Sequence, residues 1–252
     1  MPATIVVIPA RNEAERIGRV LAGVRAELPE ANVVVVDDGS QDATAAIASR
    51  AGARVVRHAF SLGYGAALQT GYRFARLQPF DRLVQLDADG QHDPASLHDL
   101  LARLDREDVD LVIGSRYLNA GDAPRGGKLR RVGSKMFAWL VTSWTGVRIT
   151  DPTSGYQAMN RRTLELLVLD HFPEDYPDAD VLILASRAGL RLAEVPVRMH
   201  PRSGGVSMHR GSRAAYYLYK MVLNLALLPV RRSSPFRDGR ADAKAAAAAR
   251  TS

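Results

Sequence analysis

Two aspartates separated by a single residue, Asp87 and Asp89, follow directly after the largely apolar run 83–86. Carboxylates at the end of a buried strand can converge on one hard divalent cation, and Mg²⁺ or Mn²⁺ accepts such oxygens together with water and substrate phosphates. The bound ion would neutralise charge on a departing diphosphate. A helix cap before Pro94 is the simpler interpretation of Asp93, but it does not explain Asp87 and Asp89. We therefore predict a metal site at these two residues.

A second acidic pair, Asp37 and Asp38, ends the apolar run 33–36 and is followed by Gly39 and Ser40. A carboxylate at this place can accept hydrogen bonds from a ribose diol or from a base N–H. The same residue types also suit a tight turn that caps a helix. The residues alone leave both interpretations open.

Five short runs rich in β-branched residues alternate with segments of helical periodicity in the first half of the chain. They cover residues 4–9, 32–37, 53–57, 82–87 and 109–114. This alternation predicts right-handed βαβ units and an α/β fold, a Rossmann-like, doubly wound, mostly parallel sheet flanked by helices. Ligands bind such sheets beyond the carboxyl ends of the strands, where both acidic pairs fall.

The second half of the chain has a different organisation. We expect a loop at residues 119–127, a turn at 151–155, a strand at 191–197 and a polar loop at 200–211. Helices are expected at 129–145, from about Arg161, and at 181–188. The domains are then a catalytic domain over residues 1–211, an amphipathic helix over 212–232 and a disordered tail over 233–252.

Composition narrows the class of protein. The 252 residues include no cysteine, which excludes disulfides and Cys-ligated zinc, and the net charge is +7. The charge favours an anionic partner, but no nucleic-acid-binding motif accompanies it, so we expect no nucleic acid partner. We find neither a secretory signal nor an apolar stretch that could span a bilayer. We expect a cytoplasmic protein, or one peripheral to the inner face of the cell membrane.

Six segments in this order resemble the family 2 glycosyltransferases, the inverting GT-A group that includes dolichol- and polyprenyl-phosphate mannosyl or glucosyl synthases. The resemblance covers roughly residues 4–210. The matching segments are Pro9-Ala10-Arg11-Asn12-Glu13, Val36-Asp37-Asp38-Gly39-Ser40, Leu62-Gly63-Tyr64-Gly65-Ala66-Ala67, Asp87-Ala88-Asp89-Gly90-Gln91-His92-Asp93-Pro94, Gly114-Ser115-Arg116 and Asp151-Pro152-Thr153-Ser154-Gly155-Tyr156.

The resemblance implies metal-dependent, inverting transfer of a sugar from a UDP- or GDP-sugar. Pro9, Glu13 and Asp38 would hold the nucleoside, and Gln91 would lie close to the phosphates. The full set of donor-binding residues that we expect is Pro9, Ala10, Asn12, Glu13, Asp37, Asp38, Asp87, Ala88, Asp89 and Gln91. One segment departs from the family pattern, which often has Asn-x-Gly-Lys-Gly where this chain has Ser61-Leu62-Gly63-Tyr64-Gly65. Because the lysine is missing, we assign no phosphate role there.

The acceptor decides whether a general base is needed. A sugar hydroxyl must lose a proton, whereas a lipid phosphate is already anionic and needs only cations to hold it. Candidate bases are Asp151 and Asp175, the latter in a segment similar to the Thr-Glu-Asp motif of processive relatives but with Pro173 in place of the threonine. The expected catalytic residues are Asp89, Asp151, Asp175 and Arg116.

The loop after the last expected strand combines cationic side chains with glycines, a composition that suits an anion clamp or, alternatively, a basic surface loop. The expected acceptor- or phosphate-binding residues are Arg116, Ser154, Arg202, Ser207 and His209. The helix 212–232 suits the lipid headgroup region, or else packing on the domain or in a homo-oligomer. We expect a polyprenyl-phosphate acceptor at a membrane surface or beside a membrane partner protein. The alternative is a sugar hydroxyl of a polysaccharide or small glycoside, with an aspartate as base.

Overall fold

The computed structural model describes residues 3–118, 128–168 and 179–200, and only the backbone of residues 128–136 and 179–180. Its strands are β1 (Thr4–Ala10), β2 (Asn32–Asp37), β3 (Arg54–Arg57), β4 (Arg82–Gln85), β5 (Leu111–Ser115), β6 (Gln157–Asn160) and β7 (Leu192–Pro196). Its helices are α1 (Ile17–Glu27), α2 (Thr44–Arg50), α3 (Tyr64–Arg76), the 3₁₀ turn η1 (Pro94–Ser96), α4 (Leu97–Leu104), α5 (Lys128–Thr145), α6 (Arg161–Leu167) and α7 (Ala179–Arg187).

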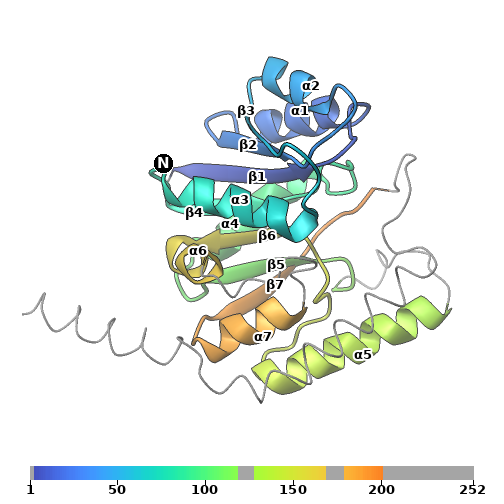
Figure 1. Cartoon of the computed structure of the whole chain (residues 1–252). Coiled ribbons are helices and arrows are strands. Elements are labelled where there is room, and N and C mark those ends of the chain that lie inside the picture. Colours follow the sequence, from blue (N-terminus) through green and yellow to red (C-terminus); the bar gives the residue numbers. More distant parts are fainter. Residues whose placement is uncertain (1–2, 119–127, 169–178, 201–252) are drawn as a thin grey trace, which may run out of the picture.

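The strands form one mixed sheet in the order β3-β2-β1-β4-β6-β5-β7 (Figure 1). The first four of these neighbours run parallel, with Val6 of β1 opposite Val33 of β2 and Val84 of β4. β7 runs parallel to β5. The expected doubly wound, mostly parallel sheet is therefore confirmed.

Strand β6 was not predicted, because we expected a turn that leads directly into a helix at this point. β6 lies between β4 and β5 and runs antiparallel to both, with Ala158 opposite Val84 on one side and Val112 on the other. Its four residues include no β-branched or aromatic side chain. Strand propensity depends strongly on packing with neighbours, and here the pairing on both sides imposes the extended conformation.

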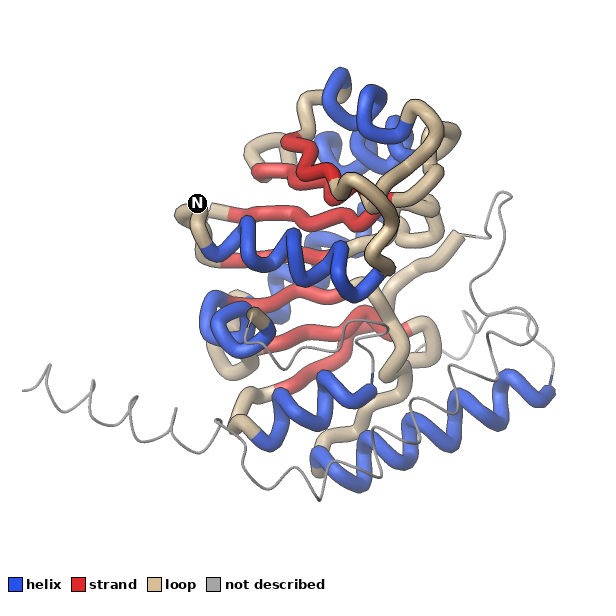
Figure 2. Tube along the Cα trace, viewed as in Figure 1, coloured by secondary structure: helices blue, strands red, loops and turns tan. Residues whose placement is uncertain are grey.

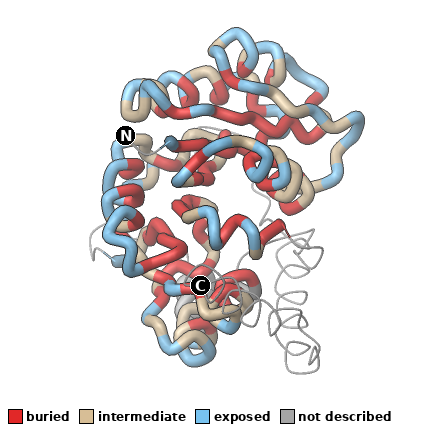
Figure 3. Tube along the Cα trace, turned by 90° about the vertical axis from the view of Figure 1, so that its left-hand side faces the viewer, coloured by how far each residue is buried: buried red, intermediate tan, exposed pale blue. Residues whose placement is uncertain are grey.

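Helices cover both faces of the sheet, as Figure 2 shows. One core contains side chains of α3, α5, α6 and α7, and the other contains side chains of α1, α2 and α4. Strand β1 is buried along its whole length, with Ile5 and Val7 in the first core and Val6 and Ile8 in the second. Figure 3 shows this buried centre between more exposed helices. A strand covered on both faces needs a continuous apolar sequence, which is why β1 and β2 are easily recognised.

Several expected boundaries agree with the structure to within two residues, namely those of α5, α7 and β7. The expected cap is also confirmed, since the Asp93 carboxylate accepts a hydrogen bond from the Ala95 N–H at the start of η1. The predicted loop at 119–127, the helix at 212–232 and the tail at 233–252 lie outside the described residues. Within the described ranges, no helix combines the length and apolar character that crossing a membrane requires.

Candidate functional site

The polar segments that follow β1 and β2 are hydrogen-bonded to each other at the carboxyl edge of the sheet. The Asn12 N–H donates to Ser40 Oγ (2.9 Å), and the Gln41 N–H donates to Asn12 Oδ1 (2.9 Å). Asn12 has a φ of 53°, in the left-handed region that asparagine tolerates better than most residues. This conformation allows Asn12 to join the two turns. Pro9 and Ala10 form the end of β1, with Ala10 opposite Asp37 of β2.

Glu13 is buried in an ion pair with Arg16, whose Nη1 lies 2.6 Å from Glu13 Oε2. The Glu13 hydrogen bond raises the pKa of Arg16 although burial opposes this, and the charge of Asp89 adds to the increase. Arg16 therefore lies within electrostatic range of the predicted metal site. No motif in the sequence had indicated Arg16, since a lone arginine before a helix carries no recognisable signal.

Asp37 and Asp38 have different surroundings. Asp37 is fully buried, and Arg57 Nε lies 2.9 Å from its Oδ2 without the alignment of a hydrogen bond. Asp38 accepts hydrogen bonds from the residues that precede α3, namely His58 Nδ1 (2.8 Å), Ser61 Oγ (2.7 Å), Leu62 N (2.8 Å) and Gly63 N (3.0 Å). Burial alone would raise the pKa of Asp38, but these hydrogen bonds outweigh it and lower that pKa. Asp38 thus holds the segment that leads into α3 close to the end of β2.

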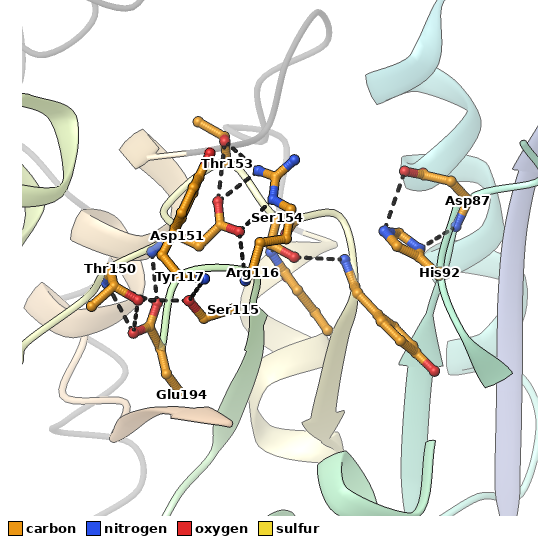
Figure 4. Close-up of polar contacts among 12 residues, drawn as sticks. Asp87, His92, Ser115, Arg116, Tyr117, Thr150, Asp151, Thr153, Ser154 and Glu194 are labelled. Carbon is orange, nitrogen blue, oxygen red and sulfur yellow. Dashed lines mark hydrogen bonds and ion pairs between the residues drawn. The ribbon is translucent and has the colours of Figure 1, made fainter. Parts of the chain in front are cut away.

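Asp87 lies just beyond β4 and contacts both Tyr64 and His92. The Tyr64 hydroxyl donates to Asp87 Oδ1 (2.9 Å), and the Asp87 N–H donates to His92 Nδ1 (3.0 Å). Burial lowers the pKa of His92 to about 4, so the ring is neutral at neutral pH. Because Nδ1 accepts a hydrogen bond, the proton of the neutral ring is on Nε2, which lies 3.7 Å from Asp87 Oδ2. Figure 4 shows Asp87 and His92 facing each other in this way.

Asp89 belongs to the same loop and accepts a hydrogen bond at Oδ1 from the Gln91 N–H (3.0 Å). The Gln91 carbonyl in turn accepts the His200 N–H (2.7 Å), and His92 forms a β-bridge with Met199. The predicted metal-binding loop is therefore attached to the chain that follows β7. The predicted phosphate-binding loop starts at that same point.

The donor set at Asp87 and Asp89 fits a magnesium or manganese ion that is only partly coordinated by protein. Within the described ranges, no three His, Asp or Glu side chains are grouped closely enough to enclose a metal ion. Magnesium commonly binds through one or two carboxylates and retains water and substrate phosphates. Gly155 lies against this carboxylate, because a Cβ at that position would be 3.2 Å from Asp87 Oδ2 and 2.9 Å from the Tyr64 hydroxyl oxygen. A glycine at position 155 therefore leaves room beside Asp87.

Arg116 and Asp151 form a bidentate ion pair. Arg116 Nε lies 2.6 Å from Asp151 Oδ2, and Arg116 Nη2 donates to Oδ1 (2.7 Å) and to Thr153 Oγ1 (3.1 Å). Asp151 is fully buried, and the backbone N–H of Arg116 also donates to its Oδ2 (3.1 Å). Figure 4 shows this group of contacts separate from that of Asp87 and His92. Both oxygens of Asp151 therefore hold Arg116. The role of Asp151 as a general base stays a prediction.

Glu194 of β7 is hydrogen-bonded to the backbone at Asp151, a role that the sequence did not indicate. Its carboxylate accepts the backbone N–H groups of Thr150 (2.8 Å) and Asp151 (2.8 Å). Burial raises the pKa of Glu194 despite these hydrogen bonds. Ser154 is buried nearby, where its Oγ accepts the Tyr156 N–H (3.3 Å). Four other candidates lie outside the described residues: Asp175, Arg202, Ser207 and His209.

Comparison with known proteins agrees with this architecture. Residues 5–167 match the model of Glycosyl transferase family 2. The chain is 33% identical over 226 residues to polyprenol monophosphomannose synthase of Mycolicibacterium smegmatis, covering 86% of this chain and 85% of that protein. It is also 33% identical over 218 residues to undecaprenyl-phosphate mannosyltransferase of Micrococcus luteus, covering 82% of this chain and 87% of the other.

A solved structure shares the fold. Glucosyl-3-phosphoglycerate synthase from Mycobacterium tuberculosis, in complex with Mn²⁺, uridine diphosphate and glucosyl-3-phosphoglycerate, superposes with a TM-score of 0.67 at 23% identity. The superposition covers 88% of this chain and 80% of that chain. The fold is therefore the GT-A fold that the motifs suggested. The chain belongs to Glycosyl transferase family 2 and is a glycosyltransferase.

Proposed function

We propose that the chain transfers a sugar from a UDP- or GDP-sugar to the phosphate of a polyprenyl-phosphate-type lipid. The names of the two relatives at 33% identity support this acceptor class, since both describe transfer of mannose to a polyprenol phosphate. A third relative, from Methanococcus voltae and 26% identical over 210 residues, is named a UDP-N-acetylglucosamine–dolichyl-phosphate N-acetylglucosaminyltransferase. Because the third name gives a different sugar from the first two, the proposal leaves the sugar open.

The observation that carries the proposal is the ion pair between Arg116 and Asp151. A hydroxyl acceptor needs a carboxylate that can take its proton. Of the two candidate bases, Asp151 already accepts hydrogen bonds from Arg116 at both oxygens, and Asp175 lies outside the described residues. A phosphate acceptor needs the opposite, a cation held in a fixed orientation. The buried carboxylate fixes the guanidinium plane through two parallel hydrogen bonds, so the orientation of Arg116 is set before an acceptor binds.

On the donor side, Asp87 and Asp89 would hold Mg²⁺ or Mn²⁺, and Pro9, Glu13 and Asp38 would surround the nucleoside. When bound, the ion would offset negative charge on the nucleoside diphosphate as it departs. The Mn²⁺ and uridine diphosphate in the structurally similar synthase are consistent with this donor chemistry.

Transfer then needs alignment more than proton transfer. An oxygen of the acceptor phosphate bonds to the anomeric carbon while the bond from that carbon to the diphosphate breaks, which inverts the configuration. Arg116 would hold the acceptor phosphate against the sugar, and Asp151 and Glu194 would keep Arg116 in place. No proton must leave the anionic nucleophile, so positioning and electrostatic stabilisation would provide most of the rate enhancement.

A radiolabel assay tests the proposal. The purified chain is incubated with Mn²⁺, undecaprenyl phosphate in detergent and a panel of labelled UDP- and GDP-sugars, and the organic-phase label is counted. We expect transfer with one donor, a loss of at least about a hundredfold in Asp89→Asn, and near wild-type activity in the control Glu165→Gln, an exposed carboxylate on α6. Transfer only to soluble hydroxyl acceptors would refute the lipid-phosphate proposal and support the aspartate-base alternative.

A lipid acceptor places the reaction at a membrane surface, and we propose that the chain binds there peripherally or through a membrane partner protein. The predicted contact is the amphipathic helix 212–232, which contains Tyr216, Tyr217, Arg231 and Arg232. Vesicle sedimentation tests this proposal. We expect a chain that ends at residue 211 to lose binding to vesicles with anionic lipids, and unchanged binding would contradict the assignment.

A further inference from the structure

A chain of hydrogen bonds connects the buried core to the predicted metal ligand Asp87. The Tyr72 hydroxyl donates to Gln85 Oε1, and Gln85 Nε2 donates to the Tyr64 hydroxyl oxygen (3.3 Å). The Tyr64 hydroxyl then donates to Asp87 Oδ1 (2.9 Å). Tyr72 and Gln85 are buried, whereas Asp87 is part-exposed at the edge of the sheet. This series of hydrogen bonds therefore connects the buried core with the predicted metal site.

The direction of these hydrogen bonds follows from the chemistry of their last member. An ionised carboxylate can only accept, so Tyr64 must donate its single hydroxyl proton to Asp87. The Tyr64 oxygen then accepts from the amide nitrogen of Gln85, and the amide oxygen of Gln85 accepts from Tyr72. Burial raises the pKa of Tyr72, which keeps its hydroxyl protonated and able to donate. The donor and acceptor roles are therefore consistent along all three hydrogen bonds.

The backbone of Tyr64 is also held in place. Tyr64 is the first residue of α3, and the preceding Gly63 has a φ of 101°, a value that favours glycine. The N–H groups of Leu62 and Gly63 donate to the Asp38 carboxylate. The segment proposed to contact the nucleoside is therefore connected, through two residues, to the side chain that contacts Asp87.

We propose that Tyr64 is a positioning residue that fixes the carboxylate of Asp87 in the orientation in which it meets the divalent ion. This inference rests on the proposed metal-dependent function. It gives a role to the segment where the family pattern often has lysine. The tyrosine hydroxyl contacts Asp87 through a neutral hydrogen bond and adds no positive charge beside the predicted cation site.

The test compares Tyr64→Phe with wild type by calorimetric titration of Mn²⁺ in the presence of UDP or GDP, and of the nucleotide alone in EDTA. Loss of an outer-sphere hydrogen bond to a metal ligand typically weakens metal affinity by about 10- to 100-fold. We expect a weakening of that size for Mn²⁺, and a change of less than about threefold for the nucleotide in EDTA. The Mn²⁺ concentration that gives half-maximal transfer should rise by the same factor. Tyr72→Phe should shift it in the same direction but less, because Gln85 then loses its fixed orientation.

Tyr156→Phe provides a control for lost stability, since the Tyr156 hydroxyl donates to the Asp93 carbonyl (3.0 Å) and not to Asp87. Tyr156→Phe should lower the melting temperature about as much as Tyr64→Phe does, and it should change Mn²⁺ affinity by less than about twofold. Equal Mn²⁺ affinity in Tyr64→Phe and wild type would overturn the positioning role of Tyr64 but would leave the proposed function standing. A parallel loss of nucleotide affinity in EDTA would also overturn it, because it would indicate a general disturbance of the loop. Failure of wild type to bind any metal–nucleotide complex would instead refute the proposed function.

Discussion

Replacement of Arg116 by methionine keeps most of the side chain's length but removes its charge from beside a buried carboxylate. Asp151 is fully buried and the Arg116 side chain is 16% exposed, so water cannot readily replace the lost guanidinium. Breaking a buried ion pair by removing one partner typically costs about 3–5 kcal/mol. We expect a loss in that range for Arg116→Met in the free energy of unfolding.

A double-mutant cycle separates the cost of leaving a charge unpaired from the cost of the other contacts that each substitution removes. Asp151→Asn should cost less, about 1–3 kcal/mol, because the asparagine amide oxygen can still accept a hydrogen bond from the guanidinium. The double variant Arg116→Met/Asp151→Asn contains no buried unpaired charge and should regain about 2 kcal/mol or more relative to the sum of the single losses. The control Glu165→Gln breaks a pair in which both side chains are about half exposed, and should cost at most about 0.5 kcal/mol.

Urea unfolding followed by circular dichroism gives the free energies from the midpoint and slope. The reasoning fails if the single losses add in the double variant to within about 0.5 kcal/mol, or if Arg116→Met is no more harmful than the control. The same variants test the chemistry, measured as turnover at saturating donor. If Asp151 acts by holding Arg116, both single variants lose turnover together. If Arg116→Met keeps wild-type turnover while Asp151→Asn loses it, Asp151 acts as a base.

Two further predictions concern stability away from the metal ligands. Burial alone would raise the pKa of Asp110, but hydrogen bonds, first that from Arg191, lower it below the ordinary value of 3.8. This stabilisation is present above about pH 4 and is lost as the pH falls through the folded-state pKa, so acid unfolding of Asp110→Asn should depend less on pH than that of wild type. Gly39 has a φ of 64°, and a Cβ there would lie 2.7 Å from the backbone carbon of Phe60. In a urea titration, we expect Gly39→Ala to lower the free energy of unfolding by about 2–4 kcal/mol. Gly146 has a similar φ of 70° but no neighbour within 4 Å, so Gly146→Ala should lower it by only about 1 kcal/mol. Equal losses would show that the close approach at Gly39 is unimportant.

The sequence by itself determined the class of fold and the position of the candidate site along the chain. Strands β1 and β2 bury both faces, so their residues form nearly continuous apolar runs that periodicity detects. Parallel strands share one carboxyl edge, and for this reason the segments that begin at Pro9, Asp37 and Asp87 could be expected together.

The tertiary structure decided which side chains meet there. Arg116 and Asp151 are 35 positions apart, and Tyr64 and Asp87 are 23 apart, so no local spacing could pair them. Tyr64 lies in a segment that matches the family pattern but lacks its lysine, and its contact with Asp87 depends on how α3 packs against β1 and β2. Strand β6 likewise exists because β4 and β5 pair with it on both sides. Local sequence encodes backbone periodicity and burial, whereas long-range polar partners depend on the packing of whole elements, which no short segment contains.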